Sequence, residues 1–206
     1  MIPNGIDVPP SGRSRTAVRA ELGIDDDDFL AVLVATLRPE KRPDLFVTAV
    51  ADAHRRNQRI RGLVVGAGPE LERTRALAGI EGPTQVVGYR EAVGELVAAG
   101  DAVCLTREVE AAPMSLLEAM ALEQPVIATD VGGVGSTVAR GESAVLVPPN
   151  NVRAFADALV ALAAEPQRAA ALGESGRRIY LERFTDGKMA DAYADLLRSV
   201  ARGSAK

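Results

Sequence analysis

Six short apolar runs recur along the chain. The first, Phe29 to Thr36, is a continuous run rich in Val and Leu, which suits a strand that is covered on both faces. The segments between the runs are long enough for a helix, or for a helix and a loop. Because parallel neighbours need crossover connections that place helices on the sheet, this alternation predicts an α/β fold with a doubly wound, six-stranded parallel sheet. The other five predicted strands are residues 62–66, 85–88, 102–106, 125–129 and 144–147.

Helix signals occupy the segments between and after the strands. Pro43 suits a first helical position, and apolar residues follow it at helical spacing. After Val147 the pattern predicts three helices with no strand among them, at about 152–164, 167–181 and 186–201, so the chain ends in an all-helical C-terminal tail. The last helix carries an apolar stripe that needs a partner: Met189, Ala192, Tyr193, Leu196, Leu197 and Val200. The four-acid run from Asp25 to Asp28 is expected to be a solvated turn.

Composition and charge narrow the class of protein. The 206 residues are 47% apolar and 25% charged, as in ordinary globular proteins, and the net charge of -4 gives no overall positive field for nucleic acid or an anionic bilayer. The lone cysteine, Cys104, lies in an apolar run and is expected to be a core residue in a reduced compartment. No apolar stretch approaches the ~20 residues of a membrane helix, and the first residues lack the order of a signal peptide. We therefore expect a cytoplasmic protein with no membrane span and no nucleic-acid partner.

Ligands of an open α/β sheet bind outside the carboxyl ends of its strands. The most informative of these ends follows the fourth predicted strand, where Glu110 lies in a loop and Glu118 lies in a predicted helix, Met114 to Leu122. Pro113 suits the first position of that helix, which would leave the N–H groups of Met114, Ser115 and Leu116 as donors for an anion. The helix dipole adds about 0.3–2 kcal/mol for a diphosphate held there, and Glu118 could then accept hydrogen bonds from a ribose.

These residues resemble a known family. Glu110 and Glu118, then Ala119-Met120-Ala121, Pro125-Val126 and Gly132-Gly133, are similar to the signature of the retaining glycosyltransferases of family four, which have the GT-B fold. The resemblance covers nearly the whole chain and implies a Rossmann-like domain that is one half of a GT-B fold. Other matching segments are 2–7, 65–70 and 145–149, with Phe184 after them.

The resemblance also implies roles for single residues. Lys41 matches a lysine that helps to hold the diphosphate, Glu110 matches the acid that binds sugar hydroxyls, and Glu118 matches the acid that binds ribose. Lys41 and Glu110 are the expected catalytic residues, and the GT-B fold implies a nucleotide diphosphate sugar as donor with no metal and no further cofactor. The residues expected to bind the donor are Arg38, Gly66, Gly68, Tyr89, Arg90, Ala112, Met114, Ser115, Leu116 and Glu118, with the base near Tyr89 and Arg90.

The sequence departs from the family pattern in two places that bear on the site. Ala35-Thr36 stands where the family often has Gly-Arg, so the second phosphate-binding cation is missing from its usual place, and Arg38 is the substitute that we expect. Glu123 replaces the usual glycine before Pro125. For Gly66 and Gly68, a role as turn glycines that permit a positive φ is as well supported as contact with a base.

The family pattern also suggests a missing half. GT-B enzymes have two Rossmann-like domains that face a cleft, and the chain begins where the N-terminal, acceptor-binding domain would end. We therefore expect residues 1–206 to be a single donor-binding domain with little transfer activity alone, because proximity of donor and acceptor supplies up to about 7–11 kcal/mol in such reactions. The last helix, about 186–201, is expected to pack on the missing domain, to fold onto its own domain or to pair with a second copy in a homodimer.

Other classes of protein fit the sequence to different degrees. A dinucleotide oxidoreductase needs a third glycine, and Leu71 occupies that position after Gly66-x-Gly68; the phosphate loop of P-loop ATPases is absent. A sugar-nucleotide epimerase of the same fold would use the same donor contacts. A non-catalytic nucleotide-binding module is the third alternative.

Overall fold

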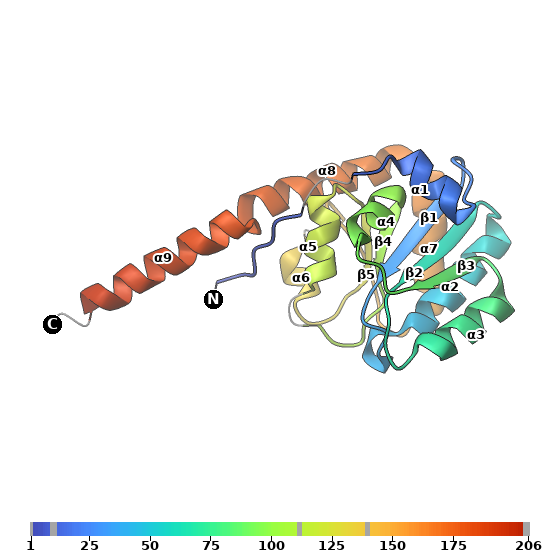
Figure 1. Cartoon of the computed structure of the whole chain (residues 1–206), viewed down its shortest axis with the longest axis horizontal. Helices are drawn as coiled ribbons and strands as arrows, with labels where there is room; N and C mark the ends of the chain where they lie inside the picture. Colours follow the sequence, from blue (N-terminus) through green and yellow to red (C-terminus); the bar gives the residue numbers. More distant parts are fainter. Residues whose placement is uncertain (1, 9–11, 111–112, 139–140, 204–206) are drawn as a thin grey trace.

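Six parallel strands form one sheet in the order β3-β2-β1-β4-β5-β6 (Figure 1). The architecture comes from a computed structural model, which describes residues 2–8, 12–110, 113–138 and 141–203. All six strands predicted from the apolar runs are present, with shifts of one or two residues at their ends. They are β1 (Phe29–Val34), β2 (Ile60–Val65), β3 (Thr84–Gly88), β4 (Ala102–Leu105), β5 (Val126–Thr129) and β6 (Val145–Val147). The prediction of a Rossmann-like, doubly wound sheet is therefore confirmed.

The helices begin at proline more than once, as the sequence indicates. Pro43 and Pro166 are at the first turns of their helices, whereas Pro113 is an extended cap residue one position before its helix, so its predicted place was wrong by one. The helix from Arg15 was not predicted. The helices are α1 (Arg15–Leu22), the 3-10 helix η1 (Pro39–Lys41), α2 (Pro43–Arg56), α3 (Leu71–Glu81), α4 (Val93–Ala99), α5 (Met114–Ala121), α6 (Val134–Thr137), α7 (Val152–Ala164), α8 (Pro166–Arg183) and α9 (Asp186–Gly203).

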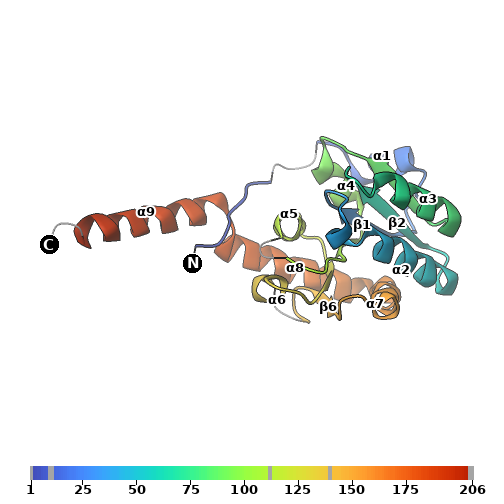
Figure 2. The same ribbon diagram turned by 90° about the horizontal axis from the view of Figure 1, so that it is seen from below.

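Both faces of the sheet are covered by helices, which explains why the strands are continuously apolar. Along β1, Ala31 and Leu33 pack in the cluster that contains α2 and α7, while Leu30 and Val32 pack in a second cluster on the other face with residues of α4. Figure 2 shows α2 and α7 on one side of the strands and α4 on the other. Cys104 of β4 is buried in the first cluster, as expected, and this burial raises the pKa of its thiol.

The order of the strands reverses between β1 and β4. The chain builds outward from β1 to β2 and β3, then returns to pair β4 on the other side of β1, with Ala31 opposite Ala102 and Leu33 opposite Cys104. The loops that leave the carboxyl ends of these two strands therefore run toward opposite faces of the sheet. Such a switch point leaves a crevice in which ligands of α/β proteins bind.

A buried arginine connects α1 to the sheet. The Arg19 guanidinium is fully buried; it donates to the carbonyl oxygens of Asp25 at 2.6 Å and Asp28 at 2.5 Å, and to Ala99 O at 3.0 Å. It also contacts Asp101 Oδ2 at 3.2 Å, and the same carboxylate oxygen accepts from the Leu30 N–H. The acidic turn is therefore only partly the solvated segment that the sequence predicted, since its backbone wraps a buried cation.

The first prediction concerns this cation. Arg19→Met should lower the free energy of unfolding by about 3–5 kcal/mol, because it leaves three backbone carbonyl oxygens without this donor and removes one of the two cations that contact the Asp101 carboxylate. Urea denaturation followed by circular dichroism measures the effect. Arg73→Met is the matched control, since the Arg73 side chain is 72% exposed and forms only a surface ion pair; a loss of equal size in both variants would contradict the prediction.

Helix α9 projects away from the sheet in both views (Figures 1 and 2). Its start is held at the domain by a bridge between Ile6 and Thr185, and the Tyr180 hydroxyl donates to Ile6 O at 2.8 Å. Farther along, the predicted apolar stripe is uncovered, with Leu197 68% exposed and Tyr193 50% exposed. The helix does not fold back onto its own domain, so that alternative was wrong. No helix in the described part of the chain is long and apolar enough to cross a membrane.

Candidate functional site

The loops after β1 and β4 line an open cavity of about 380 Å³ at the switch point. Its walls come from three places: the end of β1 and the turn after it, the β4–α5 loop, and the first turns of α5. Among the residues that the sequence singles out, it brings together Lys41, Glu110, Met114, Ser115 and Glu118. Arg107, which the sequence analysis did not select, lines it with them.

One carboxylate joins two cations in this cavity. Lys41 Nζ lies 3.1 Å from Glu110 Oε2, and Arg107 forms an ion pair with the same oxygen. A second nitrogen of the Arg107 guanidinium donates to Ser115 Oγ at 2.7 Å, which places this cation at the first turn of α5. The three charged side chains are largely buried, so their mutual interactions are only weakly screened by solvent.

Backbone contacts hold the two loops together behind the charges. The Thr106 hydroxyl contacts the carbonyl oxygens of Lys41 and Arg42, both at 2.9 Å, and the Glu108 N–H donates to Glu40 O at 3.0 Å. Since these bonds join the β1 loop to the β4 loop directly, the position of Lys41 relative to Glu110 is set by the main chain and not only by the ion pair.

Two glycines fix the backbone of Glu110. The Gly133 N–H donates to Glu110 O at 2.8 Å, and Gly132 has a φ of 48°, a conformation that favours glycine. A Cβ at Gly132 would lie 2.0 Å from Glu110 O. The close contact between the turn after β5 and the β4 loop therefore requires glycine at position 132.

Burial shifts the ionisation of the side chains in the cavity. The pKa of Lys41 is lowered by its burial and by the charges of Arg107 and Arg38, against the opposing charge of Glu40. The pKa of Glu118 is raised by burial, and the nearby Arg107 acts in the other direction. Since both cations lose solvation here, an anion bound between them would favour their charged forms.

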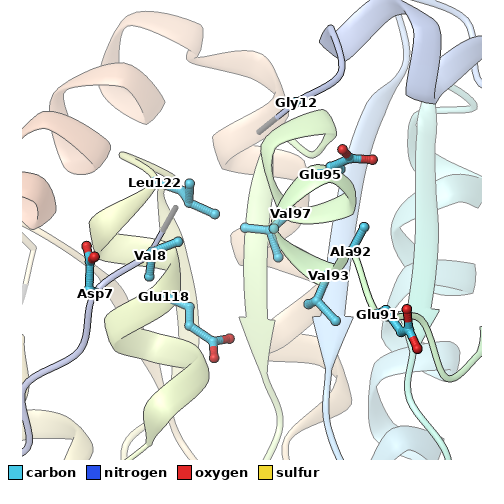
Figure 3. A pocket seen from close by; sticks show the side chains of 11 residues that line it. Asp7, Val8, Gly12, Glu91, Ala92, Val93, Glu95, Val97, Glu118 and Leu122 are labelled. Atoms are coloured by element: carbon cyan, nitrogen blue, oxygen red, sulfur yellow. The ribbon is translucent and has the colours of Figure 1, made fainter. Parts of the chain in front are cut away.

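A second cavity of about 350 Å³ lies between α4 and α5 (Figure 3). Its walls include the apolar side chains of Val93, Val97 and Leu122, and it reaches the segment that leads from β3 into α4. Glu118 lines both cavities, and in Figure 3 its carboxylate extends from α5 into the space before α4. The two cavities therefore share Glu118, so that the surface of the first turns of α5 leads on toward α4.

Several expected donor-binding residues lie outside these cavities. Arg38 is exposed and lines neither of them, Tyr89 is 69% exposed, and Arg90 is exposed beside it. Leu116 is buried and its N–H donates to Pro113 O at 3.1 Å, so the expectation that it offers a free donor was wrong. Ala112 lies outside the described residues.

Gly66 and Gly68 lie against the backbone of the β1 loop. A Cβ at Gly66 would lie 1.8 Å from Ala35 O, and one at Gly68 would lie 2.4 Å from Leu37 O. Their φ angles of 143° and 155° are also ones that L side chains rarely adopt. These contacts account for both glycines as residues that permit close packing, the alternative that the sequence left open.

A family model described as "Glycosyl transferases group 1" matches residues 14–179, which is more than half of the chain. The chain belongs to this family. A D-inositol 3-phosphate glycosyltransferase of Streptomyces bingchenggensis is 32% identical over 209 residues, and the match covers 95% of this chain and 45% of that protein. An alpha-D-kanosaminyltransferase of Streptomyces kanamyceticus is 24% identical, with 90% and 49% covered. The chain thus spans about half the length of the curated relatives that it matches.

Solved structures support the same half of a GT-B fold. HepE of Anabaena, in complex with UDP-glucose, has a TM-score of 0.85 and 24% identity, and the match covers 96% of this chain and 57% of that one. Sucrose-phosphate synthase of Thermosynechococcus elongatus has a TM-score of 0.81 and 25% identity, with 94% and 52% covered. Among the described residues of this glycosyltransferase domain, no group of three or more His, Cys, Asp or Glu side chains is placed to hold a metal ion.

The sequence analysis missed Arg107 and the contact of Gly132 with Glu110. A signal for the arginine was present, since Arg107 follows the fourth apolar run almost directly and precedes Glu110 by three residues. The selection of candidate residues at that strand end included the acids Glu110 and Glu118 but not Arg107. The family pattern contains Gly132 but does not indicate its contact with Glu110. That contact depends on the pairing of β4 with β5, which the order of residues in the sequence does not show.

The second prediction tests the glycine contact in this glycosyltransferase domain. Gly132→Ala should destabilise the fold by about 1–3 kcal/mol, because the new methyl group overlaps Glu110 O and the backbone angle is unfavourable for alanine. Thermal and urea unfolding measure it. In the control Gly79→Ala, nothing lies within 4 Å of the new methyl group, and helix propensity should leave the stability unchanged or raise it by up to about 1 kcal/mol. Unfolding midpoints that do not separate the two variants would overturn this assignment.

Proposed function

We propose that this chain is the donor-binding domain of a retaining glycosyltransferase, which binds a nucleoside diphosphate sugar and stabilises the leaving diphosphate while the sugar is transferred to an acceptor. The observation that carries the proposal is the cavity at the switch point, where Lys41 lies opposite the first turn of α5 and both acids of the Glu110 to Glu118 motif line the walls. The proposed donor therefore lies along the carboxyl ends of β1 and β4.

The diphosphate is assigned to the start of α5. No side chain caps this helix among the residues described, so the N–H groups of Met114 and Ser115 and the positive end of the helix dipole are directed at the cavity. Lys41 supplies a cation on the opposite wall. A leaving diphosphate gains negative charge as the glycosidic bond breaks, so a fixed cation stabilises the transition state more than the ground state, and we expect no requirement for a metal ion.

The nucleoside is assigned to the second cavity. Glu118 would accept hydrogen bonds from the ribose hydroxyls, since its carboxylate lies where the two cavities meet. The base would then lie toward the β3–α4 segment, near the backbone of Tyr89 and Arg90, with Val93 as an apolar contact. The raised pKa of Glu118 leaves the carboxylate ready to gain hydrogen-bond donors, because any such donor offsets the solvation lost on burial.

The sugar is assigned to the Glu110 side of the cavity. The ion pairs with Lys41 and Arg107 hold the Glu110 carboxylate in place before the donor arrives, and this carboxylate is the proposed acceptor for sugar hydroxyls. Such orientation in advance reduces the entropy that binding would otherwise cost. Because the acceptor site belongs to another domain in this proposal, the isolated chain should transfer sugar very slowly.

The third prediction tests the donor site by calorimetry. The chain should bind UDP or GDP; UDP is the first probe because structural neighbours such as HepE are in complex with it. Lys41→Met should weaken the affinity about 10- to 100-fold, the usual effect of losing one hydrogen bond to a charged group. Lys188→Met, at an exposed position on α9, should leave it unchanged.

Other outcomes of this titration favour other functions. Binding of NAD in place of UDP or GDP would indicate an oxidoreductase, and no binding of any nucleotide would indicate an interaction module. Conversion of the donor sugar without an acceptor, followed by NMR, would indicate the epimerase. Each of these results would displace the proposed transfer reaction.

We also propose that the stripe of α9 packs on the N-terminal domain of a longer protein, and that in this chain alone it pairs with a second copy. The support is the exposure of four large apolar side chains on one side of the helix: Tyr193, Leu196, Leu197 and Val200.

The fourth prediction follows from that pairing. Sedimentation equilibrium should show a dimer of the unaltered chain, because two copies can cover each other's stripes. Leu197→Glu, in the middle of the stripe, should convert it to a monomer. Arg198→Glu places a negative charge on the side of the helix opposite the stripe, at a side chain that is 68% exposed, and should leave the dimer intact. A monomer at all concentrations of the unaltered chain would exclude the second copy as the partner.

A further inference from the structure

The site lacks a cation where the family resemblance places one. Thr36 occupies that position at the end of β1 and lines the cavity, but its hydroxyl carries no charge. Arg38, the substitute suggested by the sequence, is exposed and does not line the cavity. If the donor diphosphate needs a second cation, it must come from another element of the fold.

Arg107 lies in the same cavity as Thr36 but comes from the neighbouring strand. Only 7% of the residue is exposed, and its guanidinium contacts both Glu110 and the hydroxyl of Ser115 in the first turn of α5. The Thr129 hydroxyl donates to Arg107 O at 2.6 Å, which fixes the backbone from which the side chain leaves. The cation is therefore held in position by β4, β5 and α5 together.

Positive groups from three parts of the chain lie around Arg107. Lys41 and Arg107 share a single carboxylate, that of Glu110, and the positive end of α5 lies beside them. Burial lowers the pKa of Arg107, and the charge of Glu118, which lines the same cavity, opposes that change, so the guanidinium has lost solvent contact but not its acidic neighbours. A planar guanidinium has more donors than Ser115 and Glu110 use, and phosphate oxygens match its geometry.

We infer that Arg107 supplies the second cation for the donor diphosphate and binds its outer phosphate, the one bonded to the sugar. This inference rests on the proposed function. The outer phosphate is assigned because Arg107 contacts Glu110, the residue proposed for the sugar side, whereas Glu118 and the second cavity receive the nucleoside. In this proposal the second cation comes from the loop after β4 and not, as in the family pattern, from the end of β1.

The fifth prediction compares UDP with UMP, which lacks the outer phosphate. Arg107→Met and Arg107→Gln should each weaken UDP binding about 10- to 100-fold and leave UMP binding within about threefold, as measured by calorimetry on the full chain. Two variants are used because methionine keeps the apolar packing of the arginine stem and glutamine keeps a hydrogen-bond donor. Arg38→Gln tests the rival cation and should have a smaller effect on UDP binding than either Arg107 variant. Arg59→Gln, at a 67% exposed side chain directly before β2, is the matched control and should change neither affinity by more than about threefold. GDP and GMP are titrated in parallel.

A rescue variant separates the charge from any structural role. Thr36→Arg in the Arg107→Met background returns a cation to the end of β1 and should recover most of the lost UDP affinity without restoring the contact with Ser115. Parallel losses of UDP and UMP, no loss of either, or a larger effect of Arg38→Gln would overturn the inference while the donor site stands. Failure of the unaltered chain to bind UDP or GDP would overturn the proposed function and this inference with it.

Discussion

The pairing of β4 with β1 at the centre of the sheet is the constraint on which the rest of the structure depends. It brings side by side two loops that are separated by about seventy residues in sequence, and it sends them to opposite faces of the sheet. The Thr106 hydroxyl then joins them through the carbonyl oxygens of Lys41 and Arg42. A change that shifted the register of these two strands by one residue would reverse which side chains face the cavity, because successive strand residues point to opposite faces.

The charges of the site follow from that pairing. β1 contributes a cation through Lys41, and the β4 loop contributes both a cation and an acid, so the Glu110 carboxylate lies between two positive groups of different origin. The first turn of α5 adds the positive end of a helix dipole on the same side. An isolated buried cation would be costly, but here two cations lie in one cavity with the carboxylates of Glu110 and Glu118. Half of the charged side chains in this cavity are cations, so Glu110 and Glu118 alone describe only part of it.

Sequence patterns predict the elements of this fold well and the buried charges poorly. Continuous apolar runs located all six strands, because a strand covered on both faces has no polar side to interrupt it. The motif from Glu110 to Glu118 lies at a strand end that contributes to the cavity at the switch point. By contrast, Arg19 and Arg107 resemble surface arginines in the sequence, and their burial depends on carbonyl oxygens and carboxylates brought from other elements. Glu123 shows the reverse case: a glycine was expected there, and its φ of 58° supplies the physical reason for that expectation.

The glycines after β2 affect the site indirectly, through the loop that follows β1. Gly66 and Gly68 let the β2–α3 turn pass close to the carbonyl oxygens of Ala35 and Leu37, and the Leu37 N–H in turn donates to Ala67 O at 2.9 Å. These contacts hold the chain between β1 and η1, which ends at Lys41. The glycines thus support the segment that leads to Lys41, although they line neither cavity themselves. A side chain at either position would overlap the carbonyl oxygen of Ala35 or Leu37, so the constraint on these glycines comes from the loop that they support.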